Sequence, residues 1–360
     1  MRSHLLPSLL LLAACTTPGL VATDDPALPL GPDAGQGVIV TGPDAGTADA
    51  GTLDAGAPDA GPVLKGPPYP IVLAHGFFGF DTFAGLDFLT YFYEVKDDLA
   101  AHGELLVFTP TVDPFNDSLT RSARLLQQLE AIRAQTGYAK LNVIAHSQGG
   151  LDARIVAHQR PDLIAAVLTV STPHHGTPVS DLVAGGLGNP LARAVVDSLT
   201  GIIASPLWSE ATRDTSVTAS LAQFETGVMR DFNLTWPDAP GVQYFSVAGR
   251  SSLRLAETEC GVGVLTRPPF VTDWDDTRDP LSSLLTATAP VISPNPFDPV
   301  PHDGLVPVES AKWGTFLGCV PADHLDEIGQ VAGLPPGLGN GWRHKPFYVE
   351  LVKFLRARGL

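Results

Sequence analysis

Residues 141–150 read Leu-Asn-Val-Ile-Ala-His-Ser-Gln-Gly-Gly, and this stretch decides the fold expected for the chain. Apolar and β-favouring residues come first, a sharp turn with Ser147 at its apex follows, and a helix-like segment begins at Leu151. This order is typical of a nucleophile elbow. Ala145 and Gly149, two positions to either side of the serine, are small enough for the turn to close, although glycine is usual at the first of them. The motif alone is equally compatible with an ordinary Ser-Gly turn, so its context has to decide.

Strands and helices alternate on both sides of this stretch. Apolar or β-branched runs predict strands over residues 70–74, 141–145, 163–170 and 243–248. Between the first two, the stretch Asn116-Asp117-Ser118 offers a helix N-cap, leucines follow at helical spacing, and Gly137 offers a stop. A terminal helix is expected over 346–358. Strands that alternate with helices predict an α/β fold with a doubly wound, mostly parallel sheet.

The segment 181–240 interrupts this alternation. It contains Gly185-Gly186 and helical patterns around 191–199 and 219–232. An insertion with small hinge residues between sheet elements predicts a helical lid, or cap. A rigid pair of surface helices is the alternative.

The N-terminal end predicts export. Residues 1–14 combine one arginine with a run of leucines that is too short for a permanent membrane span. The run ends in Leu-Ala-Ala-Cys, which resembles a bacterial lipobox, where the peptidase cuts before the cysteine and Cys15 carries lipid. We therefore expect a signal peptide over 1–14 and a cell-envelope lipoprotein, at the outer membrane or cell surface, held to the membrane through lipidation of Cys15. An ordinary secretion signal with a chance cysteine is the alternative.

Residues 15–62 predict a disordered tether. Pro-Asp-Ala-Gly or a close variant recurs five times, and large apolar groups are almost absent. Such a segment cannot bury enough surface to offset its ordering entropy. A cation-binding repeat is the alternative, although the repeats lack the dense oxygen ligands of a calcium loop. Residues 63–360 remain, which are enough for one large catalytic domain.

The chain is acidic, with a formal net charge of −16. Seven aspartates and one arginine give residues 1–62 a net charge of −6, which leaves −10 on residues 63–360. An acidic body argues against a nucleic-acid partner.

Beyond Cys15, the chain has two cysteines, Cys260 and Cys319. In an exported protein such a pair is expected to form a disulfide. The bridge would close the long loop that carries the candidate acid Asp303. Free buried thiols are the alternative.

A serine nucleophile needs an acid and a base, which in this kind of fold follow it along the chain in the order acid, then histidine. Asp303, in Pro-His-Asp-Gly-Leu-Val, is the candidate acid, and His324, in Ala-Asp-His-Leu-Asp, is the candidate base. His324 would take the proton of Ser147 and pass it to the leaving alkoxide, while Asp303 would orient the imidazole and stabilise its cation. Taken singly, Asp303 could belong to an ordinary Asp-Gly turn, and His324 could be a surface histidine beside acidic neighbours. In this order behind an elbow, they predict a catalytic triad.

The oxyanion formed in acyl transfer needs two backbone N–H donors. We expect one from Gln148, directly after the serine, and one from Phe77, in the loop after the first strand. His75 in that loop is expected to be structural. Aromatic residues in this region offer an apolar lining for an acyl chain, with core packing as the alternative for some of them. They are Phe77, Phe78, Phe80, Phe83, Phe88, Tyr91, Phe92 and Tyr93.

Five stretches carry a resemblance to a known family. They are V-L-A-H-G-F-F-G-F-D at 72–81, V-I-A-H-S-Q-G-G at 143–150, S-T-P-H-H-G-T-P at 171–178, H-D-G-L-V at 302–306 and H-L-D-E-I-G-Q-V-A-G-L at 324–334. In them the chain resembles the calcium-dependent bacterial true lipases of the Pseudomonas/Burkholderia type. The resemblance runs from about Pro68 to the C-terminus and is weak between 181 and 300. It implies an α/β-hydrolase fold with a lid, hydrolysis of long-chain acylglycerols, and the same triad.

The same resemblance implies one structural calcium ion near the histidine loop. Asp326 and Gln330 would be side-chain ligands, the carbonyl of Leu334 a further ligand, and Asp279 the remote aspartate. Oxygen ligands of these kinds suit Ca²⁺. The ion would hold the loop that carries the histidine and take no part in the chemistry. The alternative is that Asp326 and Glu327 are solvated surface acids.

Two features depart from that family. Its disulfide usually ends a few residues after the acid block, where this chain has Ser310 and no cysteine, so a bridge between Cys260 and Cys319 is a rearranged one. The lipidated tether is the second departure. Many such lipases need a dedicated membrane-bound folding helper, and the sequence leaves that need open.

Three kinds of function are compatible with these patterns. The first is a cell-surface triacylglycerol lipase, a carboxylic ester hydrolase that acts through an acyl-enzyme on lipid or ester substrates at an interface. The second is a short-chain carboxylesterase, a polyester depolymerase or an acyltransferase on the same triad. The third is a lipid-anchored binding protein without catalysis, which the fold alone would allow. The ordered serine, acid and histidine argue against the third.

Overall fold

A computed structural model describes residues 63–77, 91–203, 217–253, 260, 267–295, 297–330, 336–337 and 339–360. The expected signal peptide, Cys15 and the tether over 15–62 lie outside these residues. Outside them also lie Leu334, Phe78, Phe80, Phe83 and Phe88. Among the described residues, no helix has the length and apolar character of a membrane span.

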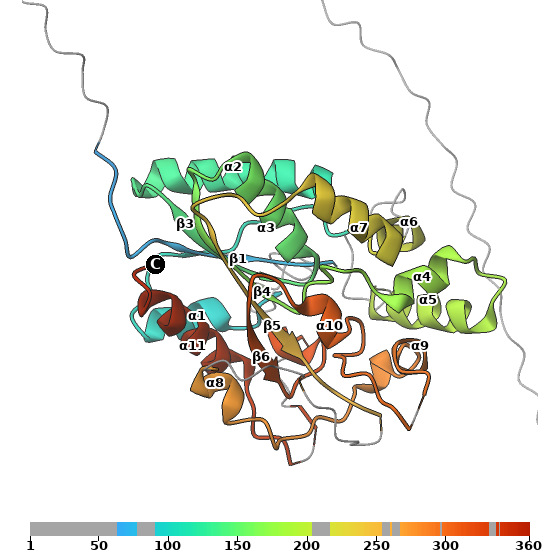
Figure 1. Ribbon diagram of the computed structural model, residues 1–360. Helices are drawn as coiled ribbons and strands as arrows, with labels where there is room; N and C mark the ends of the chain where they lie inside the picture. The colour runs from blue at the N-terminus through green and yellow to red at the C-terminus, as the bar shows by residue number, and fades with distance from the viewer. Residues whose placement is uncertain are drawn as a thin grey trace, which may run out of the picture. The chain divides into compact units, whose positions relative to one another are not determined.

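A six-stranded parallel sheet forms the centre of the described domain (Figure 1). The strands are β1 (Ile71–Ala74), β2 (Val107–Phe108), β3 (Leu141–His146), β4 (Ile164–Val170), β5 (Gln243–Gly249) and β6 (Thr315–Val320). Their spatial order is β2-β1-β3-β4-β5-β6. The chain therefore reverses its direction across the sheet between β1 and β3. In open sheets of this kind, ligands bind beyond the carboxyl ends of the strands at such a reversal.

Helices cover both faces of the sheet, as expected for a doubly wound fold (Figure 1). One face carries α1 (Val95–Ala101), α8 (Pro269–Thr272) and α11 (His344–Arg356), and the other carries α2 (Ser118–Thr136) and α3 (Gln148–Gln159). The expected caps of α2 are present, since the Asp117 side chain accepts from Thr120 N and Gly137 ends the helix at φ 72°. The α/β prediction is confirmed.

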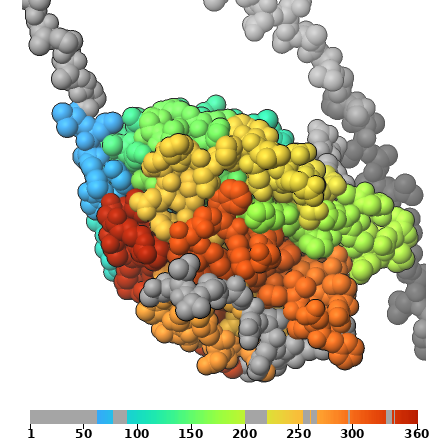
Figure 2. All heavy atoms as spheres, viewed as in Figure 1, coloured from blue at the N-terminus to red at the C-terminus, as the bar shows by residue number. Residues whose placement is uncertain are grey.

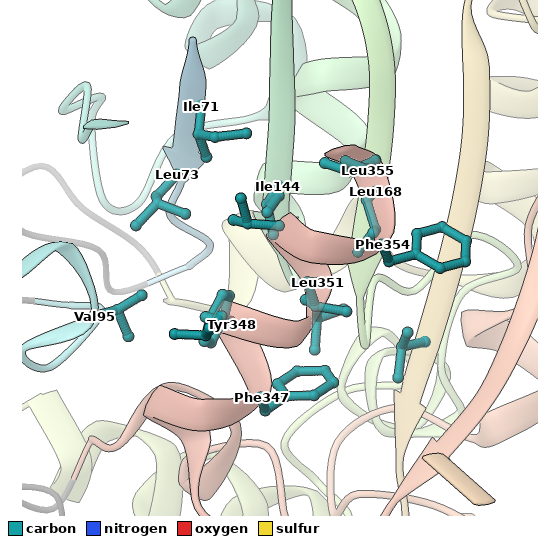
Figure 3. Close-up of a cluster of buried hydrophobic side chains, with 14 of the residues drawn as sticks. Ile71, Leu73, Val95, Ile144, Leu168, Phe347, Tyr348, Leu351, Phe354 and Leu355 are labelled. Atoms are coloured by element: carbon teal, nitrogen blue, oxygen red, sulfur yellow. The ribbon is translucent and has the colours of Figure 1, made fainter. Parts of the chain in front are cut away.

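The larger core lies between the sheet and α11. Figure 3 shows Tyr348, Leu351 and Leu355 of α11 on the side that faces Ile144 and Leu168 of the sheet. All five side chains are fully buried. The three helix positions lie on one face because they are spaced three and four residues apart. Burying one such side chain stabilises the fold by about 1.5–3 kcal/mol.

The insertion between β4 and β5 is helical, as expected, and begins slightly before the expected boundary. It contains α4 (Pro178–Ala184), α5 (Pro190–Ile203), α6 (Val217–Ala222) and α7 (Thr226–Thr235). Figure 2 shows α4 and α5, in yellow-green, at the right edge of the face in view, above the orange segments that contain α9 (Ala289–Ile292). Residues 204–216 of the insertion lie outside the described residues.

The remaining elements lie after β5, before and after β6. They are η1 (Ser283–Leu285), α10 (Val308–Ala311) and η2 (Asp326–Ile328). The expected disulfide is present, with Cys260 and Cys319 joined at an S–S distance of 2.00 Å. Cys319 belongs to β6, so the bridge ties the segment after β5 to the last strand.

Candidate active site

Ser147 occupies a sharp turn between β3 and α3. Its backbone has φ 55° and ψ −131°, a conformation that side-chain-bearing residues rarely adopt. Gly149 allows the helix to start close to the loop after β1, because a Cβ at that position would lie 2.5 Å from the carbonyl oxygen of Ala74. Gly76 of the same loop lies against the serine, since an added Cβ would be 2.6 Å from the Ser147 Cβ. The structure therefore has the geometry of a nucleophile elbow.

The three residues expected to form the triad lie together. His324 Nε2 is 2.9 Å from the Ser147 hydroxyl oxygen, and His324 Nδ1 is 2.7 Å from Asp303 Oδ2. Ser147 follows β3, Asp303 lies between β5 and β6, and His324 follows β6. They meet because the carboxyl ends of parallel strands share one edge of a sheet.

Asp303 is held as a carboxylate. Its Oδ1 accepts hydrogen bonds from the N–H groups of Leu305 and Val306, at 2.8 and 2.7 Å. Burial alone would raise the pKa of Asp303, but His324 and these two N–H groups hold that pKa below its usual value. The backbone N–H of His324 also donates to the carbonyl oxygen of Asp303 at 2.8 Å, which fixes the two loops to each other.

A second buried network lies behind the triad, and the sequence patterns did not indicate it. His146 Nε2 lies 2.9 Å from Glu327 Oε2, and its Nδ1 lies 2.7 Å from the Tyr91 hydroxyl. The Ser171 hydroxyl donates to Glu327 Oε1 at 2.5 Å. The rings of His146 and His324 are 4.5 Å apart between centroids. Glu327 is therefore a buried structural group, and the interpretation of it as a solvated surface acid is wrong, because no part of it is exposed.

Burial governs the charge of this network. Burial, with Asp303 nearby, raises the pKa of Glu327 well above its usual value. Burial, with His324 beside it, lowers the pKa of His146 well below its usual value. Both shifts favour the uncharged forms, as expected for groups removed from water.

The loop after β1 places Phe77 in the cavity beside Ser147. Its ring packs edge-on against Phe115 and Phe224. Gln148 begins α3, and its side chain donates to the carbonyl oxygen of Asn116 at 2.8 Å. The roles of the Phe77 and Gln148 N–H groups as oxyanion donors stay predictions.

His75 is buried in the same loop. Its Nε2 accepts from Val112 N at 3.0 Å, so the neutral ring carries its proton on Nδ1, which lies 3.0 Å from the carbonyl oxygen of Gly76. Burial, followed by the charge of Arg121, lowers the pKa of His75 to about 3. These contacts support the expected structural role of His75.

The cavity beside Ser147 has mostly apolar walls. It is lined by Phe77, Tyr91, Pro173, Val179, Leu199, Leu221, Phe224, Leu305, Val306, Leu325 and Gln330, together with Thr177 and the residues of the site. Leu199 and Leu221 come from the insertion, on α5 and α6. Tyr91 lines the cavity, whereas Phe92 packs against Tyr348 in the core. Of the aromatic residues expected to line the cavity or pack in the core, Tyr91 therefore does the first and Phe92 the second.

Three aspartates form a cluster close to the histidine loop, in which Asp279 and Asp323 are buried and Asp326 is partly buried. Carboxylate oxygens of Asp279, Asp323 and Asp326 lie within 4.8 Å of one another. Burial raises the pKa of Asp279 to about 7, and burial together with the charge of Asp323 raises that of Asp326 to about 8. Carboxylates packed this closely favour a hard divalent cation among them. Asp279 and Asp326 were expected here, and Asp323 was not.

The expected roles of Gln330 and Leu334 as metal ligands stay predictions. Gln330 lies in the lining of the cavity, and its buried Nε2 has no hydrogen-bond partner among the described residues. Leu334 lies outside the described residues. Asp323 also shapes the loop, because its Oδ1 accepts from the N–H groups of Leu325 and Asp326 and its Oδ2 from Ser282 N.

Comparison with known proteins indicates that the chain is a hydrolase. A family model described as alpha/beta hydrolase fold matches residues 69–187. A protein named triacylglycerol lipase from Vibrio cholerae is 33% identical over 288 residues, which cover 74% of this chain and 81% of the relative. One of the same name from Pseudomonas fragi is 31% identical over 317 residues, which cover 81% of this chain and 97% of the relative. The crystal structure of Bacillus licheniformis lipase BlEst2 in mature form has a TM-score of 0.51 at 20% identity, covers 81% of this chain and 95% of that chain, and shows the fold alone.

Proposed function

The chain belongs to the triacylglycerol lipase family of α/β-hydrolases, a family of carboxylic ester hydrolases, and from this premise we propose that it cleaves long-chain acylglycerols through an acyl-enzyme on Ser147. The single observation that carries the proposal is the hydrogen-bonded series from Ser147 through His324 to Asp303. At these distances the histidine can act as the base that takes the proton of the serine. The carboxylate can then stabilise the positive charge on the histidine.

In the acylation step, His324 Nε2 takes the proton of the Ser147 hydroxyl while the serine oxygen attacks the ester carbonyl carbon. Asp303 stabilises the imidazolium that results. The N–H groups of Phe77 and Gln148 donate to the oxyanion. His324 then gives its proton to the leaving alkoxide, and the acyl group stays on Ser147. In the second step a water molecule, activated by the same histidine, attacks the acyl-enzyme and releases the carboxylic acid.

The apolar lining of the cavity supports a substrate with a long acyl chain. Leu199, Leu221 and Phe224, which belong to the insertion, line the same cavity as Ser147 and His324. An acyl chain placed there would leave water, which is worth about 0.8 kcal/mol for each buried methylene group. Because two of these side chains belong to α5 and α6, a movement of the insertion would open and close the site, which is the behaviour of a lid.

The aspartate cluster supports one structural calcium ion. Asp279 and Asp326, with Asp323 as an added ligand, would supply its carboxylates, and Leu334 and Gln330 stay proposed ligands. When bound, the ion supplies positive charge that offsets the mutual repulsion of the three carboxylates. Asp326 lies two residues after His324, so a fixed cluster keeps the loop of the catalytic histidine in place.

The N-terminal sequence supports the proposed place of the enzyme. We propose that residues 1–14 are removed, that Cys15 carries lipid, and that the enzyme acts at the cell envelope on ester substrates at an interface. Mass spectrometry of the mature N-terminus tests this: lipid on Cys15 is expected, and a free N-terminus at another residue would contradict it.

Two linked measurements test the proposed function. Purified protein is first incubated with a serine-reactive alkyl phosphonate, and the modified residue is located by peptide mass spectrometry. An adduct on Ser147 is expected, and Ser147→Ala should show none. An unmodified wild-type protein would favour the non-catalytic binding protein instead.

Hydrolysis rates on butyrate and oleate esters are then compared below and above the solubility limit of each ester. A lipase should prefer oleate esters and should gain rate above the solubility limit. A preference for soluble butyrate esters without that gain would identify a short-chain carboxylesterase. Transfer of the acyl group to an added alcohol in place of water would identify an acyltransferase, and release from an insoluble polyester a depolymerase.

A further inference from the structure

Arg121 is a fully buried cation outside the triad. It lies in the first turn of α2, and no part of its side chain is exposed. Its Nε donates to Asp152 Oδ2 at 2.8 Å. Its Nη2 donates to the carbonyl oxygen of His75 at 2.8 Å and to that of Gly76 at 3.3 Å, and its Nη1 donates to the carbonyl oxygen of Asp113.

These contacts join the two segments that carry the expected oxyanion donors. His75 and Gly76 directly precede Phe77 in the loop after β1. Asp152 lies on α3, the helix whose first residue is Gln148. Because β1 and β3 are neighbours in the sheet, the two donors lie on either side of the point where the chain reverses its direction. Arg121 is thus bonded to both of the segments that carry the expected oxyanion donors.

The geometry of one peptide group links Arg121 to Phe77. The carbonyl oxygen of Gly76 faces two donors, Arg121 Nη2 and His75 Nδ1. The bond between Gly76 and Phe77 is trans, as the one cis bond among the described residues is Pro67-Pro68. In a planar trans peptide the N–H points opposite to the C=O. Holding the Gly76 carbonyl therefore sets the direction of the Phe77 N–H.

We propose that Arg121, held by Asp152, is a positioning residue for the oxyanion hole that fixes the Phe77 N–H relative to the start of α3. This inference rests on the proposed function, because it concerns the transition state of ester cleavage. Arginine suits the role because its planar guanidinium offers five donors in a rigid fork, which reach three carbonyl oxygens and one carboxylate together. Lysine keeps the charge but has a single flexible donor centre, so it cannot hold all four acceptors.

Stability alone does not account for this pair. A buried ion pair loses the hydration of both charges, and apolar residues of similar volume often replace such a pair without loss of stability. Burial raises the pKa of Asp152 to about 6 even though Arg121 is beside it. Arg121 and Asp152 are therefore charged groups in a place that two apolar residues could fill. Their presence agrees with a need for hydrogen-bond donors to the loop after β1.

The test compares Arg121→Lys with a matched control, Arg154→Lys. Arg154 is a second buried arginine, on α3, and its guanidinium donates to Asn233 and to the carbonyl oxygen of Trp236 rather than to the loop after β1. Both variants are assayed on a soluble ester and titrated with an alkyl trifluoromethyl ketone, whose adduct with Ser147 places an oxyanion in the hole. Melting temperatures are recorded for both.

Arg121→Lys should lower kcat by about 10–100-fold, somewhat less than the 10²–10³-fold typical of removing a donor outright. KM should change by less than about threefold, because the hole binds the transition state more strongly than the substrate. Affinity for the ketone should fall by the same factor as kcat/KM, and the pH midpoint of kcat should not move. Arg154→Lys should lose comparable stability and keep kcat and ketone affinity within about threefold.

Asp152→Asn, which keeps the shape of the side chain, is the second variant, used alone and in combination with Arg121→Lys. It should lower kcat and ketone affinity in the same way, and the double variant should lose less than the product of the two single losses. The proposal is overturned if folded Arg121→Lys or Asp152→Asn keeps its ketone affinity within about threefold of the wild type, the range expected for the control. It is also overturned if the two variants change KM and leave kcat unchanged. A wild-type protein that binds neither phosphonate nor ketone would overturn the proposed function and this inference together, whereas an active wild type with unaffected variants rejects the inference only.

Discussion

The Nε2 atom of His324 lies 2.9 Å from the hydroxyl oxygen of Ser147, although the two residues are 177 positions apart in the chain. Nothing local brings them together. The serine follows the third strand and the histidine follows the last, so their distance depends on the order of strands between them. Reactivity at this serine is thus a property of the whole sheet.

Replacing the nucleophile should remove turnover and leave the fold unchanged. We expect Ser147→Ala to lower kcat by about 10⁴-fold or more, since triad members act as a unit. Ser283→Ala, at an exposed serine, is the control and should keep full activity. Ester hydrolysis and thermal melting of the two variants check this, and substantial turnover by Ser147→Ala would mean that another residue is the nucleophile.

The glycine after the elbow should tolerate no side chain. A Cβ at Gly149 would meet the carbonyl oxygens of Ala74 and His75 at 2.5 and 2.6 Å, and backbone atoms cannot move aside easily. We expect Gly149→Ala to lower the free energy of unfolding by about 1–3 kcal/mol and to reduce activity. A Cβ added at Gly227 in α7 would meet no atom of the described residues within 4 Å, so Gly227→Ala should raise the free energy of unfolding by about 0.5–1 kcal/mol. Urea denaturation of both variants decides the matter, and equal stability of the two would contradict the steric argument.

The buried His75 should make stability depend on pH. Burial lowers its pKa from 6.5 to about 3, so the folded state cannot take up the proton that the unfolded chain binds below pH 6.5. The stability contribution of neutral His75 is therefore present above pH 6.5 and is lost as the pH falls. Between pH 7.5 and pH 5 this amounts to about 2 kcal/mol.

The measurement compares unfolding free energies of the wild type and His75→Gln at the two pH values. The difference between them should shrink by about 2 kcal/mol at pH 5, because the variant lacks the titrating group. A constant difference between wild type and His75→Gln would show that His75 does not contribute in this way.

The disulfide should stabilise the loop that carries the acid. Cys260 and Cys319 are 59 residues apart, and Asp303 lies between them. In the chain-entropy description, closing a loop of that length raises the free energy of the unfolded chain by about 4 kcal/mol. We expect a Cys260→Ala, Cys319→Ala double variant to lose up to that amount and to lose activity at a lower temperature. Reductant should destabilise the wild type and leave the double variant unchanged; an effect on both would point to a different cause.

Calcium should raise the melting temperature through the aspartate cluster. At a calcium concentration 100 times Kd, binding to the folded state adds about 2.7 kcal/mol. For a domain of this size that corresponds to roughly 4–5 °C. Chelation should reverse the gain, and Asp326→Asn should abolish the response, while Asp273→Asn, at an exposed acid, should keep it. Identical melting curves of the wild type with and without chelator would exclude a structural calcium ion.

Short-range patterns account for the parts of the fold that could be predicted. The strand before Ser147, the cap at Asp117 and the stop at Gly137 follow from residue types within a few positions of one another. The patterns did not indicate α1, β2 and β6. The strand β2 has two residues, and Gly318, at φ 135°, interrupts the apolar residues of β6. Their places are set by pairing with neighbouring strands rather than by their own sequence.

The sequence by itself determined the elbow at Ser147, the order of nucleophile, acid and histidine, and the pair of cysteines, because turn chemistry and residue order are written along the chain. Only the tertiary structure decided that Glu327 lies behind the triad against His146, that Asp323 joins Asp279 and Asp326, and that Arg121 reaches the loop after β1. These contacts depend on which loops meet at the carboxyl edge of the sheet. That meeting follows from strand order and packing, and no stretch of a few residues encodes it.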